Sequence, residues 1–243
     1  MAGGRGYRLA PGQSLRVGPG PEAVFAYLAV RGGLDLAPVF GSRSFHARSG
    51  LGGTGMGALG GDATIPIQGL VAPELALIDP MPHGPAAIAV LPGPQIDHIE
   101  PASWAAFLES AWAIGARSDR MGIRLDGPVL RHSDRGYNIV SDGIALGSVQ
   151  LPGDGCPIVL GADRQTTGGY TKIAVISRAD MFRFVQFPAG ATVRFRCCSL
   201  DQAVRSLRTL GTCLDKLRLS PADRNLDSET LLSHNLIDGV VLG

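Results

Sequence analysis

The sequence has few cysteines, no excess of either charge and no long apolar run. Lys and Arg number 22 and Asp and Glu number 21, so no basic field is available to attract nucleic acid. No apolar run approaches the roughly 20 residues of a membrane span. The first residues also lack the charged, apolar and small-residue regions of a signal peptide. These absences favour a cytoplasmic protein that binds neither nucleic acid nor membrane.

The cysteines and histidines lack the spacing of a metal site. The 4 cysteines include one adjacent pair, but no Cys-x-x-Cys motif, and the 5 histidines are scattered along the chain. We therefore expect no metal centre, and we expect reduced, mostly structural cysteines. Cys156 is a weak candidate nucleophile because no histidine accompanies it in sequence.

Glycine and proline are abundant, and both favour short strands joined by turns. The chain has 34 Gly and 17 Pro in 243 residues. The predicted fold is mainly β with a few helices. A strand is expected over residues 23–30. One helix is expected over residues 101–112, with Trp104, Phe107 and Trp112 at helical spacing. A second, amphipathic helix is expected to follow the capping-box sequence at residues 199–202.

The chain divides into three predicted regions. Prolines cluster over residues 73–85 and indicate a linker. We therefore expect a first β lobe with its linker over residues 1–84, a second β lobe over residues 85–198, and a C-terminal helix and tail over residues 199–243. The last part of this tail, residues 220–243, has weak periodicity.

The most distinctive stretch is residues 147–177. Two short apolar runs at residues 158–160 and 173–176 are typical of strands, and the polar, glycine-bearing segment between them is too long for a minimal hairpin. This segment offers a carboxylate, a guanidinium group, an amide and two hydroxyls in succession, followed by Gly168 and Gly169. It is either a binding site on a β scaffold or a well-hydrogen-bonded connection.

Two other segments carry arginines suited to an anion. Arg43, His46 and Arg48 stand among glycines and serines in a predicted loop, whose alternative interpretation is a solvated surface loop. Arg120 and Arg124 are four residues apart, so in an extended strand they would point to the same side. Two guanidinium groups on one face would attract a carboxylate, a carbonate-like group or a phosphate.

Four stretches, in this order, carry a family resemblance. They are residues 27–35 with 41–44, residues 91–95 (Leu-Pro-Gly-Pro-Gln), residues 118–128, and residues 150–160 with 162–170. The last contains Gln-Leu-Pro-Gly-Asp-Gly-Cys-Pro-Ile-Val-Leu and Ala-Asp-Arg-Gln-Thr-Thr-Gly-Gly-Tyr. The pattern resembles the biotin-dependent carboxyltransferase-like family. That family includes the C-type subunit of bacterial 5-oxoprolinase, KipA-type regulators, and the carboxyltransferase part of urea carboxylase, also named allophanate hydrolase subunit 2.

The resemblance implies a fold and a function. The fold would be two cyclophilin-like β-barrel lobes, the first incomplete because the glycine-rich N-terminal stretch of the family is missing here. The function would be that of a subunit of an ATP-dependent 5-oxoprolinase-type hydrolase, which opens 5-oxoproline to glutamate. It would act with an A-type subunit and a KipI-like B-type subunit on a small carboxylate or amide substrate. ATP would be used by the complex, and this chain itself would bind no cofactor.

The candidate site residues follow from the resemblance and from the chemistry of these segments. Asp163 is the general-base candidate, and amide or hydroxyl donors would polarise the substrate carbonyl. The predicted catalytic residues are Asp163, Gln165, Thr166 and Thr167. The predicted substrate-binding residues are Arg43, His46, Arg48, Arg120, Arg124, Arg164, Gly168, Gly169 and Tyr170.

Two alternatives stay open. The first is carboxyl transfer from carboxybiotin to urea or a related amide, with biotin on a separate carrier because the chain has no biotin-attachment motif. The second is a non-catalytic KipA-type regulator that binds a KipI-like kinase inhibitor. Ser141-Asp142-Gly143 stands where the family usually has Ser-Glu-Pro, and this departure favours the regulator.

Overall fold

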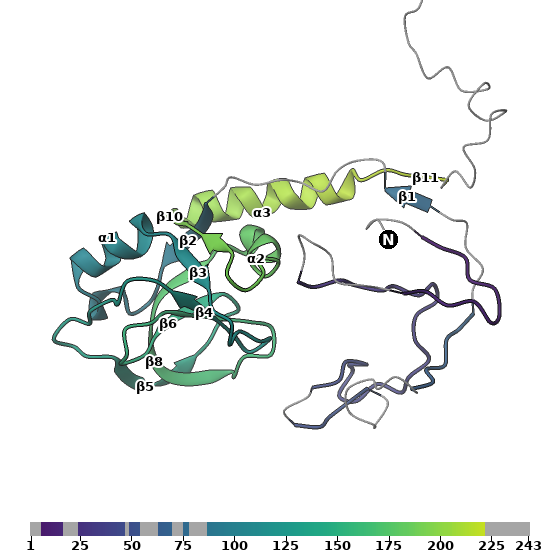
Figure 1. The fold of residues 1–243 in the computed structure, drawn as a ribbon, viewed down its shortest axis with the longest axis horizontal. Coiled ribbons are helices and arrows are strands. Elements are labelled where there is room, and N and C mark those ends of the chain that lie inside the picture. The colour runs from purple at the N-terminus through teal and green to yellow at the C-terminus, as the bar shows by residue number, and fades with distance from the viewer. Residues whose placement is uncertain are drawn as a thin grey trace, which may run out of the picture.

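The computed structural model describes residues 6–16, 24–46, 49–53, 63–69, 75–77 and 87–221. Their elements in chain order are β1 (Leu75–Leu77), β2 (Ile88–Pro92), the 3-10 helix η1 (Ile96–His98), α1 (Pro101–Glu109), β3 (Trp112–Ile114), β4 (Gly122–Asp126), β5 (Asn138–Gly143), β6 (Ser148–Leu151), β7 (Ile158–Leu160), β8 (Thr167–Ile176), α2 (Arg178–Phe184), β9 (Thr192–Val193), β10 (Phe195–Cys197), α3 (Leu200–Asp215) and β11 (Leu219–Pro221). The expected mainly-β class with a few helices is confirmed (Figure 1).

The central feature is a nearly closed, barrel-shaped sheet. Its strand order is β10-β2-β8-β6-β7-β4-β3-β9, and β5 pairs with β8 beside this path. The two strands at the ends of the path, β9 and β10, are consecutive in the chain and are separated only by Arg194. The carbonyl of Arg194 accepts a hydrogen bond from the backbone N–H of Ile88, at 2.8 Å. The chain itself therefore brings the ends of the sheet together.

Large apolar side chains fill this sheet and the side covered by α1. Phe107 of α1 stacks on Phe195 of β10 with ring centroids 4.8 Å apart, and the indole N–H of Trp112 donates to the Phe107 carbonyl at 2.9 Å. All three side chains are buried. Burying a side chain of this size contributes about 2–3 kcal/mol, so the core provides a rigid support for the strands that carry the site.

A bulge in β8 changes the alternation of its side chains. Val149 of β6 pairs with Ala174, but the next residue, Gln150, pairs with Lys172. Ile173 is therefore the extra residue. A bulge of this kind interrupts the alternation of side chains between the two faces of the sheet. Lys172, Ile173 and Ala174 are consequently all buried.

The first predicted helix is shorter than expected. α1 ends at Glu109, and Trp112 lies in β3, so the helical spacing of the aromatic residues continued past the true end of the helix. Trp112 is nevertheless a core residue, because β3 places its ring against Phe107 with centroids 5.8 Å apart.

The C-terminal helix is confirmed together with its capping box. The Ser199 side chain accepts a hydrogen bond from the Gln202 backbone N–H, and the Gln202 side chain accepts one from the Ser199 backbone N–H. α3 packs against α2 and β2 and then extends beyond the barrel (Figure 1). Its apolar side chains remain partly exposed, with Leu207 and Leu214 each 43% exposed.

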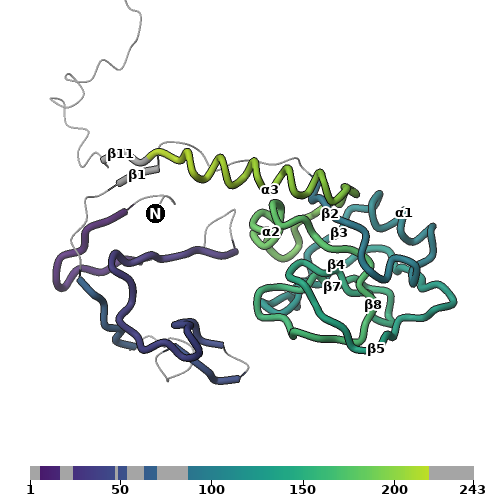
Figure 2. The backbone as a smooth tube through the Cα atoms, turned by 180° about the vertical axis from the view of Figure 1, so that it is seen from behind, coloured from purple at the N-terminus to yellow at the C-terminus, as the bar shows by residue number. Residues whose placement is uncertain are grey.

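The described residues before β1 form isolated bridges only. They join Leu34 to Ile67, Val39 to Ser42, and His46 to Leu51. The expected strand at residues 23–30 is not formed over its described part, residues 24–30, which has no partner strand. These segments, purple in Figure 2, lie beside the barrel. The Gln186 side chain joins the two parts, because it accepts from the Phe25 N–H and donates to the Phe25 carbonyl.

The predicted boundary between residues 84 and 85 lies outside the described residues. Residues 222–243 of the predicted C-terminal region also lie outside them. Residues 75–77 and 219–221 pair as antiparallel strands, so the linker region and the segment after α3 meet. The three-region division stays a prediction.

Candidate functional site

The distinctive stretch at residues 147–177 forms three adjacent barrel strands, β7, β6 and β8. The expected strand at residues 173–176 is longer than predicted, because β8 already begins at Thr167. The connection from β7 to β8 is correspondingly shorter, at residues 161–166. Thr167, Gly168 and Tyr170 lie in β8 because β5 pairs with this part of the strand. They belong to the sheet and not to a loop.

Asp163 forms an ion pair with Arg120. The carboxylate Oδ1 lies 3.0 Å from Arg120 Nη2, and the Asp163 backbone N–H donates to the Arg120 carbonyl. The Arg120 side chain is 61% exposed and that of Asp163 is 23% exposed. Exposed pairs of this kind contribute little stability. The structure thus brings two predicted site residues together, with their charges already paired.

Arg164 is directed to the backbone. Its Nε donates to the Ile144 carbonyl at 3.1 Å and its Nη1 to the Gly161 carbonyl at 3.3 Å. Thr166 also contacts Ile144, because its carbonyl accepts from the Ile144 N–H at 3.0 Å. These bonds fix the connection between β7 and β8, and they hold Gln165 next to β8.

Arg120 and Arg124 have different surroundings. β4 begins at Gly122, so the alternation of an extended strand does not reach Arg120. Arg124 instead lies near Cys156, whose pKa is raised, first by desolvation and then by the charges of Asp154 and Asp126, while Arg124 opposes this shift. A raised pKa disfavours the thiolate, so this thiol is a poor nucleophile.

The strongest polar feature of the barrel is the buried lysine Lys172. Its side chain is only 3% exposed, and Nζ lies 3.1 Å from Oδ2 of Asp142, whose side chain is 57% exposed. The hydrogen bond from Lys172 is the largest cause that lowers the pKa of Asp142. The backbone N–H of Gly143 and the positive charge of Lys172 add to this shift, and the Gln95 side chain adds a smaller part. A buried cation with one partly solvated partner is a group that can act on a ligand.

The motif at residues 91–95 brings a second polar side chain, Gln95, to Lys172. Gly93 donates its N–H to the Ile173 carbonyl at 2.8 Å, and a Cβ on Gly93 would overlap the Lys172 carbonyl oxygen. Only glycine allows this approach. The contact brings Gln95 to β8, where its side-chain Oε1 accepts from the Lys172 N–H at 3.1 Å.

Gln150 completes the cluster, which we call the lysine cluster and define as Lys172, Asp142, Gln95 and Gln150. Gln150 is 3% exposed and lies opposite Lys172 in the pairing of β6 with β8. Its side-chain Nε2 is buried without a hydrogen-bond partner. A buried donor without a partner is uncommon and calls for an explanation.

Gly169 and Tyr170 lie at the outer end of β8. A Cβ on Gly169 would lie 3.2 Å from the Ile139 carbonyl oxygen, so this position is also confined by β5. Tyr170 is 43% exposed, and its ring centroid lies 6.4 Å from that of Tyr137. The two aromatic rings form a partly open surface on the strand that carries Lys172.

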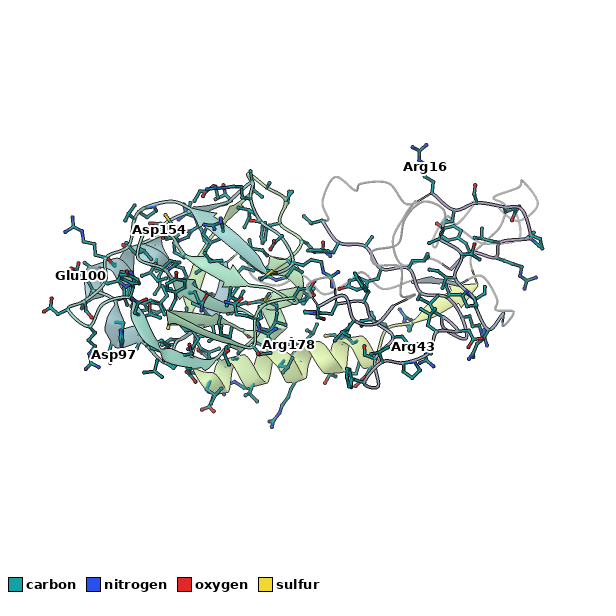
Figure 3. All side chains as sticks on the ribbon, turned by 90° about the horizontal axis from the view of Figure 1, so that it is seen from below. Arg16, Arg43, Asp97, Glu100, Asp154 and Arg178 are labelled. Carbon is teal, nitrogen blue, oxygen red and sulfur yellow. The ribbon has the colours of Figure 1, made fainter. Side chains whose placement is uncertain are left out.

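The predicted loop around Arg43 and His46 is not brought to this cluster. Arg43 Nε donates to the Leu36 carbonyl at 2.8 Å, and His46 Nδ1 lies 2.7 Å from the Ser49 hydroxyl. Arg48 lies outside the described residues. Figure 3 shows Arg43 on the early part of the chain, well separated from Asp154 on the barrel. In this structure the two predicted arginine segments are therefore separate.

Lys172 is not among the site residues predicted from the sequence. A signal was present, because Lys172 directly precedes the apolar run at residues 173–176, where a charge is unusual. Within the described part of the chain, no cluster of three or more His, Cys, Asp or Glu side chains could hold a metal ion. Nor does any helix among these residues have the length and apolar character needed to cross a membrane.

The sequence of this barrel and of the segments before it also matches a known family. Residues 1–197 match the family model of the carboxyltransferase domain, subdomain A and B. The chain therefore belongs to this family, and the resemblance drawn from the four motifs is confirmed.

Individual relatives show the same relationship. The chain is 39% identical over 206 residues to the C-type subunit of 5-oxoprolinase from Escherichia coli, covering 83% of this chain and 66% of that protein. It is 32% identical over 220 residues to the corresponding 5-oxoprolinase subunit from Haemophilus influenzae, covering 90% and 71%. The chain thus spans roughly two thirds of the length of these relatives. The solved urea carboxylase of Kluyveromyces lactis shares the fold with a TM-score of 0.66 at 23% identity, covering 76% of this chain and 18% of that one.

Proposed function

We propose that this chain is a subunit of an ATP-dependent 5-oxoprolinase-type amide hydrolase that converts 5-oxoproline to glutamate. The names of the Escherichia coli and Haemophilus influenzae relatives support this substrate. In this proposal the chain acts with an A-type subunit and a KipI-like B-type subunit, and it binds no cofactor itself. The observation that carries the proposal is the lysine cluster on the signature strands.

The chemistry of the reaction fits a buried cation. Water adds to the ring carbonyl of 5-oxoproline, the C–N bond breaks, and the nitrogen takes up a proton. Negative charge develops on the carbonyl oxygen, and a fixed cation in a poorly solvated site stabilises such charge strongly. Lys172 is the described cation best suited to this role, because its side chain is almost fully buried and its counter-ion is partly solvated.

The predicted catalytic residues take supporting positions in this proposal. Gln165 lies beside β8 and is a candidate donor to the carbonyl oxygen. Asp163 is a weaker candidate for the general base than the sequence indicated, because Arg120 already pairs with its carboxylate. Thr166 and Thr167 stay candidates for donors at the start of β8.

The second candidate function is carboxyl transfer to urea or a related amide. The fold shared with the urea carboxylase of Kluyveromyces lactis favours it. In that reaction the biotin would arrive on a separate carrier, and Lys172 and Gln150 would suit a carboxylate or ureido oxygen. Release of glutamate without a biotin carrier separates the two functions.

The test is reconstitution of the chain with A-type and B-type subunits, followed by measurement of ATP-dependent glutamate release. We expect Lys172→Met to lower kcat by about 100-fold or more, as loss of a charge-stabilising group does. The control is Arg135→Ala, which removes a surface ion pair with Asp97 and should leave kcat unchanged. Size-exclusion chromatography and thermal melting confirm that each variant folds and assembles.

Two outcomes would contradict the proposal. An assembled Lys172→Met complex with wild-type turnover would remove Lys172 from the chemistry. A wild-type complex that assembles but releases no glutamate would instead support the non-catalytic KipA-type role, in which the chain binds a KipI-like partner.

A further inference from the structure

The buried carboxamide of Gln150 is not explained by the fold alone. Its side-chain Nε2 is enclosed by protein and has no hydrogen-bond partner, and only 3% of the residue is exposed. Leaving a donor unpaired costs folding free energy, and a methionine of similar length would fill the same space without this cost. A polar group retained in such a position is often a functional group.

A second amide nitrogen converges on the same place. Gly168 faces Gln150, and the position that a Cβ on Gly168 would occupy lies 3.1 Å from Gln150 Nε2 and 3.5 Å from Gln165 Nε2. Two side-chain donors from different segments, β6 and the connection before β8, are therefore directed to one side of Gly168. The end of the Ile144 side chain also borders this place, with Cδ1 2.8 Å from the same point, so a ligand group beside Gly168 would require this flexible side chain to move.

The chemistry of this place selects an acceptor. Two N–H donors are satisfied by an oxygen with two lone pairs, such as a carbonyl, and not by another donor. The nearest fixed positive charge on the neighbouring strand is Lys172, which pairs with Gln150 in register. Side chains in such a pair lie about 5 Å apart at Cβ. A carbonyl that gains negative charge would therefore be held by donors and by a cation.

We propose that the Gln150 carboxamide is a specificity-determining donor that binds, together with Gln165, the ring carbonyl oxygen of a lactam substrate beside Gly168. This inference rests on the proposed function, because it places the carbonyl of that substrate class. It goes beyond it by assigning Gln150, which selects amide carbonyls over saturated rings with the same carboxylate.

The test measures binding of three small molecules to the full chain by calorimetry. They are 5-oxoproline, the neutral lactam 2-pyrrolidinone, and proline, which keeps the ring and carboxylate but has no ring carbonyl. We expect wild type to bind both lactams and to discriminate against proline. Gln150→Met should weaken binding of both lactams by at least about tenfold, with an unchanged or higher melting temperature because the unpaired donor is gone.

Gly168→Ala is the second variant. Its Cβ would lie 2.8 Å from the flexible end of Ile144, which can move, so the variant should fold and yet occupy the space beside Gln150. It should lose lactam binding as Gln150→Met does. Gln13→Met is the control, since Gln13 is exposed and accepts a local hydrogen bond from Ala10.

The outcomes distinguish this inference from the proposed function. Gln150-dependent binding of 2-pyrrolidinone without binding of 5-oxoproline supports the role of Gln150 and opposes the 5-oxoprolinase function. Lactam binding that is unaffected by Gln150→Met overturns the role of Gln150 and leaves the function standing. A wild-type chain that binds neither lactam overturns the role of Gln150.

Discussion

Replacing Gly93 by alanine tests how the residue 91–95 motif supports the lysine cluster. The new Cβ would overlap the carbonyl oxygen of Lys172, and it would lie 2.6 Å from the carbonyl carbon of Ile173 and 2.7 Å from the backbone nitrogen of Ala174. All of these are backbone atoms of β8, which cannot rotate aside as the end of a side chain can. Because ordinary contacts begin at 3.4 Å, the motif has to move away from the strand.

The size of the effect follows from the bonds that this movement breaks. Gly93 N–H donates to the Ile173 carbonyl at 2.8 Å, and Gln95 N–H donates to the Lys172 carbonyl at 3.2 Å. Each such bond contributes about 1 kcal/mol, and overpacking adds about 1–3 kcal/mol. We therefore expect Gly93→Ala to lower the free energy of unfolding by about 3–5 kcal/mol.

Urea unfolding followed by tryptophan fluorescence measures this loss, because Trp112 lies in β3 and Trp104, on α1, packs against the barrel core. The control is Gly143→Ala on β5. No atom lies within 4 Å of its added Cβ, and the backbone N–H that donates to Asp142 is kept. A Gly93→Ala chain within about 1 kcal/mol of wild type would refute the argument, since overpacking alone costs at least that much.

Three further predictions concern charge, helix propensity and thiol reactivity. The pKa of Asp142 is lower in the folded state than in the unfolded state, so the unfolded state binds more protons at acid pH. The contribution of Asp142 to stability is therefore complete above about pH 4, and it is lost as the pH falls through the lowered pKa of the folded state. When the free energy of unfolding is measured against pH, Asp142→Asn should therefore lose less stability at acid pH than wild type does. An unchanged acid dependence would contradict the lowered pKa of Asp142. Gly211→Ala in α3, with open space around its Cβ, should raise the urea-derived unfolding free energy by about 0.5–1 kcal/mol, and a decrease would oppose this expectation. Iodoacetamide should modify exposed Cys197 before Cys156, whose pKa is raised, as peptide mass spectrometry would show, and the reverse order would be evidence against the raised pKa.

Local signals in the sequence predicted those parts of the fold that local interactions determine. The start of α3 was predictable because Ser199 and Gln202 cap each other over three residues. The end of α1 was not, since the spacing of aromatic residues ran on to Trp112, which the pairing of β3 with β4 and β9 holds in a strand. The strand expected at residues 23–30 depended on a partner strand that the described residues do not supply.

The candidate site was predictable by location and less so by residue. The signature motifs include the strands that carry Gln150 and Lys172, and Gln165 Nε2 lies near Gln150 Nε2 on one side of Gly168. The burial of Lys172 could not be predicted from its neighbours in sequence, because it depends on Gln95 and Asp142, which are distant in the chain. The bulge at Ile173 also shifts the register that a simple alternation would assign.

In the proposed function, the position of Asp142 bears on how the buried Lys172 would meet a ligand. Lys172 is held by the core, but its counter-ion lies on β5, which pairs only with β8 among the described strands. The Asp142 side chain is 57% exposed, so its carboxylate would be hydrated if a ligand replaced it at Lys172. An incoming carboxylate would take its place at Nζ and compensate the buried charge, whereas a carbonyl oxygen would accept a hydrogen bond only.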